Sequence, residues 1–474
     1  MLFRSPGQAE ASDTDRQHIA WAIAAARRQL GTAEGGVLAY LQDVLLGVEG
    51  PEPLLRARFV RRWQQFTAPV MAKAVEDTLF YRYVRLVSLN DVGAEPRRFG
   101  LSVPAFHQAN QQRARYTPHG LLATSTHDSK RSEDVRARLN VLSEMPREWE
   151  AVVLALQAAG ERFQSVVDDA PAPSARDRWA LFQALVGIWP ADGADAASLP
   201  GLRERIQRYM VKAMREAKLQ SNWLFPHEAY EAAVAQYIEK ALATDRFVGI
   251  LEDWVRRIAP YGFRNSLCQV ALKLTAPGVP DVYQGCEQWN FSLVDPDNRR
   301  PVEFSALARR LDELQAWYAG GLYPDESRWR SVLGDGAAMP DAAKQLATWR
   351  LLQTRARYAS LFRDAIYLPL AVEGAAAAHV LAFARILEGS AILVVCSRLI
   401  SLWASVQQGQ WSDTRVAVAR AHPVLGKING WQDACTGQTI ANAGALAMAT
   451  VLGDIGPGGN RLPFAVLTPV ENPA

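Results

Sequence analysis

The sequence has little cysteine and no long uninterrupted hydrophobic run. Its 474 residues include four cysteines, and no two of them have the spacing of a metal or redox motif. Because no disulfide framework is evident, we expect a reducing compartment, the cytoplasm. The longest apolar region, residues 379–403, is interrupted by Arg385, Glu388 and Arg398, which favours strands over a membrane span. The first residues lack the apolar core of a signal peptide.

A strong charge of one sign is also missing. The formal net charge is only +3, so neither nucleic acid nor a membrane surface is expected as a partner. The turn at 456–460 has no Lys-Ser/Thr pair after it and is not a phosphate-binding loop. The loop at 295–298 has calcium-type side chains, but Pro296 and the lack of a glutamate at EF-hand spacing argue against calcium. We therefore predict no cofactor and no metal.

The overall composition is that of a globular protein. Hydrophobic residues make up 49% and charged residues 21% of the chain, and the length allows two or three domains with a large core. The 14 tryptophans and 13 tyrosines are core residues on the simplest interpretation. Their flat rings also suit a carbohydrate binder, because sugar rings have apolar faces.

The chain divides by pattern into six segments. Helical periodicity dominates the first half, and short apolar runs separated by turns dominate the end. The predicted segments are 1–55 (helical), 56–139 (a strand with a polar motif), 140–250 (a helical subdomain), 251–323 (a short strand and a polar loop), 324–365 (a connector and helix) and 366–474 (a β domain).

The most informative stretch is Thr124 to Asp134. It follows an apolar run that predicts a buried strand, and it precedes a strongly charged helix. A His-Asp pair at the C-terminal end of such a strand is where an α/β barrel carries its chemistry, so His127 and Asp128 are candidate site residues. The alternative is an ordinary helix start, capped by Ser132 or Asp134, with its arginines solvated.

Two further windows are rich in polar side chains. In residues 72–83, helical spacing gathers four polar groups on one side, Lys73, Glu76, Asp77 and Tyr81. That face is either a ladder of ion pairs on a solvated surface or a wall that hydrogen-bonds hydroxyl groups. In residues 295–300, Asp295, Asp297 and Arg299 form a dense polar loop, which we expect to hydrogen-bond over a substrate.

Three windows together, 72–83, 124–136 and 277–301, resemble the maltooligosyl trehalose synthase family of the α-amylase superfamily, glycoside hydrolase family 13. The resemblance extends over nearly the whole chain and is weakest at 1–50 and in the C-terminal β domain. It implies an α/β fold: the C-terminal part of a (β/α)8 amylase-type barrel with large helical insertions, followed by a small antiparallel β domain.

The resemblance also implies a reaction, an intramolecular transglycosylation. The reducing-end α-1,4 linkage of a maltooligosaccharide becomes an α,α-1,1 linkage, by chemistry of the retaining type. Asp128 would be the third carboxylate of the site, which supports the distorted sugar and its positive charge. The residues implied to contact substrate are His127, Lys130, Arg131, Lys73, Glu76, Asp77, Tyr81, Asp295, Asp297 and Arg299.

The chain departs from the family in one respect. The family's nucleophile motif, Gly-x-Arg-x-Asp, and its acid-bearing strand would both lie upstream of these windows. The segment from Gly262 to Ser266 has serine in place of the aspartate, and it is expected to start a helix at Asn265. Glu239 lies in a segment of helical period and is expected on the surface. We therefore predict a chain that is inactive alone. It is expected to be either a fragment of a longer or split gene product, with the missing N-terminal barrel portion as its partner, or a degenerate partner.

Three functions remain open. The first is the isomerase, acting on maltooligosaccharide and followed by a maltooligosyl trehalose trehalohydrolase. The second is an α-glucan hydrolase of the same superfamily, and the third is a non-catalytic glucan-binding remnant.

Overall fold

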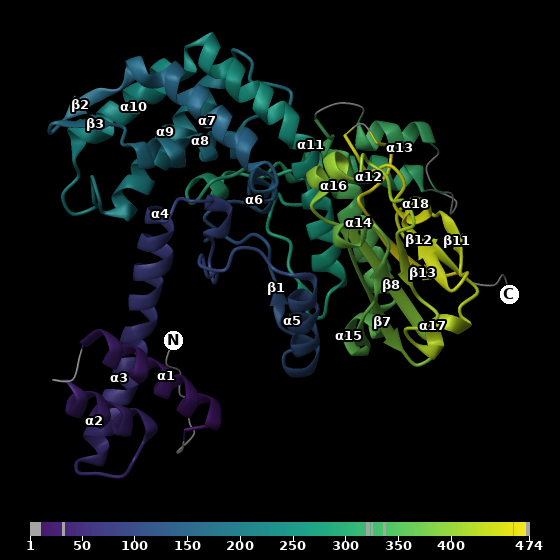
Figure 1. Cartoon of the computed structure of the whole chain (residues 1–474), viewed down its shortest axis with the longest axis horizontal. Helices are drawn as coiled ribbons and strands as arrows, with labels where there is room; N and C mark the ends of the chain where they lie inside the picture. The colour runs from purple at the N-terminus through teal and green to yellow at the C-terminus, as the bar shows by residue number, and fades with distance from the viewer. Residues whose placement is uncertain are drawn as a thin grey trace. The chain divides into compact units, whose positions relative to one another are not determined.

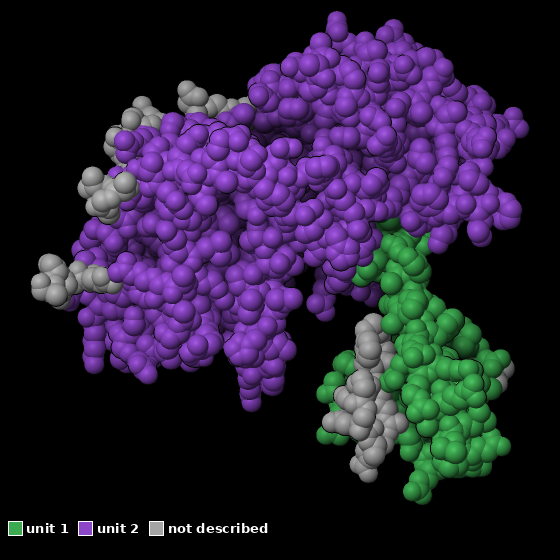
Figure 2. All heavy atoms as spheres, turned by 180° about the vertical axis from the view of Figure 1, so that it is seen from behind, with its two compact units in different colours: residues 1–82 green, residues 83–474 purple. Residues whose placement is uncertain are grey.

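The computed structural model divides into two compact units, residues 1–82 and 83–474, which are described separately (Figure 2). The boundary falls inside the segment predicted as 56–139. Within the described ranges, no helix has both the length and the apolar composition that crossing a bilayer requires. The described residues are 11–30, 34–318, 323, 326–334, 338–457 and 459–470.

The first unit is helical. Its elements are α1 (Asp13–Leu30), α2 (Gly35–Leu46), α3 (Pro53–Met71), η1 (Ala72–Leu79) and α4 (Phe80–Arg82). Ile19 and Ile23 lie one turn apart on α1 and pack with Leu38 and Val44 of α2 and with Val60 of α3. This small core explains why the three helices lie against one another.

The second unit contains a pair of short parallel strands, β1 (Leu121–Leu122) and β4 (Val279–Pro280). Parallel pairing needs a long crossover, and the 156 residues between the two strands supply it largely as helices. The expected strand before Thr124 is thus present, but the prediction that it is buried is wrong, because Leu121 is 77% exposed. In the part of the chain that the structure describes, β1 pairs with β4 alone and so leaves one edge open.

Helices fill most of the chain from 103 to 275 (Figure 1). Trp149 stacks on Trp254, and Phe182 packs against Phe247, so aromatic rings join α7, α8 and α11. The helices are α5 (Val103–Tyr116), α6 (Glu133–Asn140), α7 (Pro146–Gly160), α8 (Ala175–Ile188), α9 (Leu199–Ala217), α10 (Glu228–Leu242) and α11 (Asp245–Thr275), and a small hairpin pairs β2 (Ser165–Val167) with β3 (Ala170–Ala172).

Helix α11 begins earlier in the chain than the sequence predicted. The predicted helix start at Asn265 is wrong, since Asn265 lies well inside a helix that begins at Asp245. Buried apolar residues such as Leu251, Val255 and Ile258 keep helical spacing up to Gly262, so the helix continues across the segment that imitates a nucleophile motif. Glu239 lies on α10 and is exposed, as expected.

The C-terminal part contains antiparallel sheets (Figure 1). Six strands have the order β11-β10-β13-β8-β7-β5, and three have the order β12-β9-β6. Trp403, Trp411 and Trp431 are buried in the core that these strands share. The strands are β5 (Ile366–Pro369), β6 (Val372–Glu373), β7 (Val380–Leu387), β8 (Ser390–Ser397), β9 (Arg415–Ala417), β10 (Gly430–Asp433), β11 (Thr439–Ala441), β12 (Ala445–Ala447) and β13 (Phe464–Pro469).

Several further helices lie in the second unit. They are η2 (Val87–Leu89), η5 (Asp297–Arg299), α12 (Phe304–Trp317), α13 (Glu326–Leu333), α14 (Asp341–Arg357), α15 (Ala359–Asp364), α16 (Ile400–Val406), α17 (Pro423–Lys427) and α18 (Met448–Val451). Buried polar contacts attach the sheets to the helices. Glu144 accepts bonds from the backbone and hydroxyl of Ser401 at the start of α16, at 3.1 and 2.8 Å. His107 Nδ1 lies 2.8 Å from the hydroxyl of Tyr367.

Candidate functional site

The loop after β1 is folded by its own hydroxyl groups. Ser129 Oγ accepts the backbone N–H of Thr126 at 3.0 Å, and Thr126 Oγ1 accepts the N–H of Asp128 at 3.2 Å. Ser125 Oγ accepts the N–H of Glu133 at 2.8 Å. These local bonds explain the run of Ser and Thr residues, because each satisfies a backbone donor that no strand or helix would pair.

The same loop leaves the His-Asp pair at the surface. Both His127 and Asp128 are exposed. Among the described residues, no hydrogen bond or ion pair reaches the carboxylate of Asp128. Asp128 is therefore a carboxylate held by its backbone and open toward a ligand.

Lys130 and Arg131, which follow, are turned inward. Both are buried, and Arg131 donates to the carbonyl of Val87 at 3.2 Å and to the hydroxyl of Tyr209 at 2.6 Å. Arg131 therefore connects the loop to η2 and α9. The contact of these two side chains with a sugar stays a prediction.

The alternative of an ordinary helix start capped by the side chain of Ser132 or Asp134 is not realised. Helix α6 begins at Glu133, but Ser132 makes no capping bond with its side chain. Its hydroxyl instead donates to the carbonyl of Asn290, and its N–H donates to the carbonyl of Ser292 at 2.9 Å. Ser132 thus joins the loop after β1 to the chain that follows β4.

The polar loop at 295–299 lies against the His-Asp motif. Asn298 donates from Nδ2 to the carbonyl of His127 at 3.0 Å, and the hydroxyl of Tyr283 donates to the carbonyl of Asn298 at 3.1 Å. The structure therefore brings together two windows that are more than 160 residues apart in the sequence.

The acids of this loop are held by basic side chains. Asp295 lies 2.5 Å from Arg299, and Lys212 of α9 donates to the carbonyl of Asp295 at 2.7 Å. Asp297 receives a bidentate pair of bonds from Arg205 at 2.8 and 2.9 Å. Burial alone would raise the pKa of Asp297, but the bonds and charge of Arg205 outweigh it and lower the pKa. Asp297 therefore stays ionised and fixes the loop.

A buried ionic cluster lies under the motif. Lys344 of α14 contacts Glu133 at 2.8 Å and Asp134 at 2.7 Å, and Lys273 of α11 donates to Thr124 at 2.8 Å. Lys273 also lies 3.4 Å from Glu133, and all four ionisable side chains are at most 3% exposed. The alternative of solvated arginines is wrong for Arg131, which is buried, and Arg136 is half-buried with its Nε 3.2 Å from Asp91.

The cluster shifts the pKa values of its acids in opposite directions. Burial alone would raise the pKa of Glu133, but Lys344 and Lys273 outweigh it and lower the pKa to about 2. Burial and the neighbouring charge of Glu133 raise the pKa of Asp134 despite Lys344. Glu133 is therefore the acid that the two lysines stabilise as a carboxylate.

The stability that Glu133 provides is expected to depend on pH. Its pKa lies at about 2 in the folded chain, below the ordinary value of 4.5. Its contribution is thus complete above about pH 4.5 and is lost as the pH falls toward 2. The difference in unfolding free energy between the wild type and Glu133→Gln should shrink over that window, measured by urea unfolding at several pH values. A difference that stays constant or grows would contradict this.

The four candidates of the first unit lie on and beside η1. Lys73 and Asp77 form an ion pair of 2.6 Å, and the Lys73 side chain is 74% exposed. The predicted ladder of ion pairs is thus present for this pair, although the segment is wound as a π-helix. Tyr81 is buried, and Glu76 is half-buried. Their role as a sugar-binding wall stays a prediction.

Comparison with known proteins bears on the whole chain. No family model matches it. A Mycobacterium tuberculosis protein provisionally named maltooligosyl trehalose synthase is 38% identical over 394 residues, 83% of this chain and 43% of that protein. The structure of maltooligosyltrehalose synthase from Arthrobacter ramosus is similar with a TM-score of 0.75 at 33% identity, covering 96% of this chain and 51% of that one. A second maltooligosyl trehalose synthase structure has a TM-score of 0.66 at 26% identity, covering 95% and 55%.

These findings first define the class of protein, a mixed α/β chain whose structural neighbours have the fold of glycoside hydrolase family 13. Within that class the chain is a relative of the maltooligosyl trehalose synthases, and the resemblance seen in the sequence is confirmed. The chain spans about half the length of the relatives that it matches.

Proposed function

We propose that this chain forms part of a maltooligosyl trehalose synthase, which converts the reducing-end α-1,4 linkage of a maltooligosaccharide into an α,α-1,1 linkage. One observation carries the proposal. The His-Asp loop follows one of two parallel strands, and the polar loop that follows the other strand donates from Asn298 to His127. Loops after parallel strands are where an α/β barrel gathers its active site.

In this proposal Asp128 is the third carboxylate of a retaining site. It accepts hydrogen bonds from the distorted sugar and stabilises the positive charge of the oxocarbenium-like transition state. It neither attacks the anomeric carbon nor protonates the leaving oxygen. His127 donates to sugar hydroxyls. Because the Asp128 carboxylate is open and its backbone is fixed, it needs little rearrangement to act.

The remaining candidates bind the sugar chain. Lys130 and Arg131 lie near the reducing-end sugar and position it, and the polar loop closes the pocket. An isomerase must also exclude water while the released glucose turns over, since water would give hydrolysis. The other proposed contacts are Lys73, Glu76, Asp77, Tyr81, Asp295, Asp297 and Arg299.

The two carboxylates that make and break bonds come, in this proposal, from an N-terminal barrel portion. The open edge of β1 and the exposed side chains of Leu121 and Val279 support such a partner, because paired barrel strands would cover them. The trehalose-ended product would then pass to a maltooligosyl trehalose trehalohydrolase.

We expect the purified chain alone to leave maltopentaose unchanged. Addition of the N-terminal half of a related synthase should restore loss of reducing ends without release of glucose. Reducing-end assay and chromatography of the products measure both. Appreciable conversion by the chain alone would contradict the proposed incompleteness, and glucose release by the mixture would favour a hydrolase. Maltopentaose binding without turnover in the mixture would favour a non-catalytic remnant.

A further inference from the structure

His127 and Asp128 are the two central residues of a tight turn, residues 126–129. The N–H of Ser129 closes this turn by donating to the carbonyl of Thr126 at 3.3 Å. Turns of types I and II differ mainly by a half rotation of the peptide between the two central residues. Type II needs a positive φ at the third residue, and Asp128 has a negative φ, which fits type I. A rotation of one peptide would therefore redirect the Asp128 side chain.

The peptide between His127 and Asp128 is held at both ends. Its N–H, which belongs to Asp128, donates to Oγ1 of Thr126 at 3.2 Å. Its carbonyl, which belongs to His127, accepts from Nδ2 of Asn298 at 3.0 Å. The first contact is local, whereas the second comes from a residue 171 positions further along the chain. Because a peptide is planar, fixing its N–H and its carbonyl fixes the plane from which Asp128 departs.

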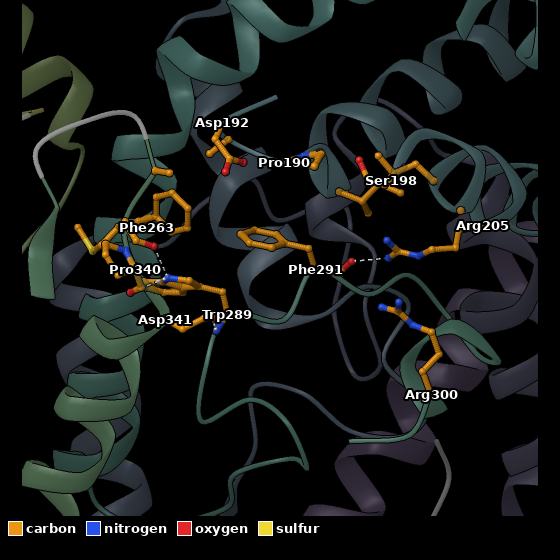
Figure 3. A pocket seen from close by; sticks show the side chains of 16 residues that line it. Pro190, Asp192, Ser198, Arg205, Phe263, Trp289, Phe291, Arg300, Pro340 and Asp341 are labelled. Atoms are coloured by element: carbon orange, nitrogen blue, oxygen red, sulfur yellow. Dashed lines mark hydrogen bonds between the residues drawn. The ribbon is translucent and has the colours of Figure 1, made fainter. Parts of the chain in front are cut away.

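Asn298 is itself firmly supported. It lies in η5 and is 8% exposed, and the hydroxyl of Tyr283 donates to its carbonyl at 3.1 Å. The preceding residue, Asp297, is held by the bidentate contact from Arg205. Arg205 also donates to the carbonyl of Phe291 at 2.6 Å (Figure 3). A side chain anchored in this way can impose its geometry on a turn that it contacts.

The side-chain amide of Asn298 has one suitable orientation. Nδ2 faces the carbonyls of His127 and Thr126, at 3.0 and 3.4 Å, so exchanging the nitrogen and the oxygen would set oxygen against oxygen. The oxygen Oδ1 is buried and accepts no hydrogen bond from the described part of the chain. An unpaired buried acceptor lowers the stability of a fold. Stability alone therefore does not favour an asparagine here, whereas its donor group serves the turn.

We propose that Asn298 is a positioning residue, which keeps the peptide between His127 and Asp128 in one orientation and so directs the Asp128 carboxylate toward the sugar. Because no hydrogen bond reaches that carboxylate among the described residues, the backbone is what sets its direction. Asn298 contacts no reacting atom and acts through Asp128. The direction toward a sugar rests on the proposed function, whereas the fixing of the turn rests on the contacts above.

Hydrogen exchange of the chain alone tests the effect on the turn. Asn298→Ala removes the donor, and Asn298→Asp replaces it with an oxygen at nearly constant size. Both variants should speed exchange of the Asp128 amide about fivefold, the effect of losing one hydrogen bond, because a rotated peptide also breaks the bond to Thr126. Mass spectrometry with fragmentation that resolves residues 126–129 measures the rate.

Asn442→Ala is the matched control. Asn442 also donates from Nδ2 to two carbonyls, at 2.8 and 2.7 Å, but in a loop of the C-terminal β domain. Its replacement should leave the exchange of the Asp128 amide unchanged. Amides of α11 should exchange in both Asn298 variants as in the wild type. Faster exchange throughout α11 would mean that Asn298 supports the whole fold, and would overturn the proposal.

Kinetics of the chain mixed with the N-terminal half of a related synthase test the catalytic consequence. Asn298→Ala should lower kcat about 10²-fold, the cost of a displacement of about 1 Å, and change KM less than about threefold. Asn442→Ala should leave both as in the wild type. An inactive wild-type mixture would contradict the proposed function, while the exchange rates still decide whether Asn298 fixes the turn. Unchanged exchange at Asp128, or faster exchange with an unchanged kcat, would overturn this inference.

Discussion

Replacing Asp128 by asparagine is expected to lower kcat of the reconstituted enzyme by about 10³-fold, the cost of removing one group that stabilises transition-state charge. The proposed role requires a full negative charge beside the oxocarbenium-like sugar, and the amide of Asn keeps the shape but not the charge. The KM for maltopentaose should change much less, because the charge is needed mainly in the transition state. Steady-state kinetics of the chain mixed with an N-terminal half measure both quantities.

The variant should not weaken the fold. The Asp128 side chain is exposed, and no hydrogen bond or ion pair reaches its carboxylate within the described residues. Asp253→Asn is the matched control, since Asp253 has a side chain 80% exposed on α11. Both variants should unfold at the same urea concentration as the wild type. A kcat for Asp128→Asn within a few-fold of the control would contradict the assigned role.

Local signals predicted a large part of the fold. The alternation of short apolar runs with turns gave strands at β7, β8, β9 and β13, because each run is long enough for a strand and is bounded by polar residues. The strand before Thr124 was also predicted, but its exposure was not. An apolar run indicates burial only when the surfaces that cover it are present, and β1 pairs with β4 alone among the described residues.

Only part of the candidate site could be predicted from the sequence. The His-Asp pair and the polar loop could be found because their residue types are unusual and close together in the sequence. The buried lysines that lie under these residues could not be found in the same way. Lys344 contacts Asp134 across 210 residues, and Lys273 contacts Thr124 across 149. Lys273 stands alone in an apolar helical stretch, and that single charge was the available signal for a buried partner. Lys344 gave no such signal, because Asp341 precedes it by three residues at the spacing of an ordinary helical ion pair.

The same supporting residues give the largest expected loss of stability. Lys344→Met should lower the free energy of unfolding by about 3–5 kcal/mol near neutral pH, since it leaves buried carboxylates without their cation. Lys344 is fully buried and is the lysine that contacts both Glu133 and Asp134. Urea unfolding followed by circular dichroism measures the change. Lys240→Met, at an exposed position of α10, is the control and should unfold like the wild type.

A second substitution separates lost charge from lost packing. If the cost of Lys344→Met comes from uncompensated acids, then adding Asp134→Leu should recover part of the stability, because an apolar pair can replace a buried ion pair of similar volume. Lowering the pH should also reduce the difference in unfolding free energy between Lys344→Met and the wild type, since protonation of the buried carboxylates removes the charge that the lysine balanced. If the cost comes from a cavity instead, neither change will help. Two results together would show that packing rather than charge holds the His-Asp loop over this cluster. The double variant would be no more stable than Lys344→Met, and the difference in unfolding free energy between Lys344→Met and the wild type would not depend on pH.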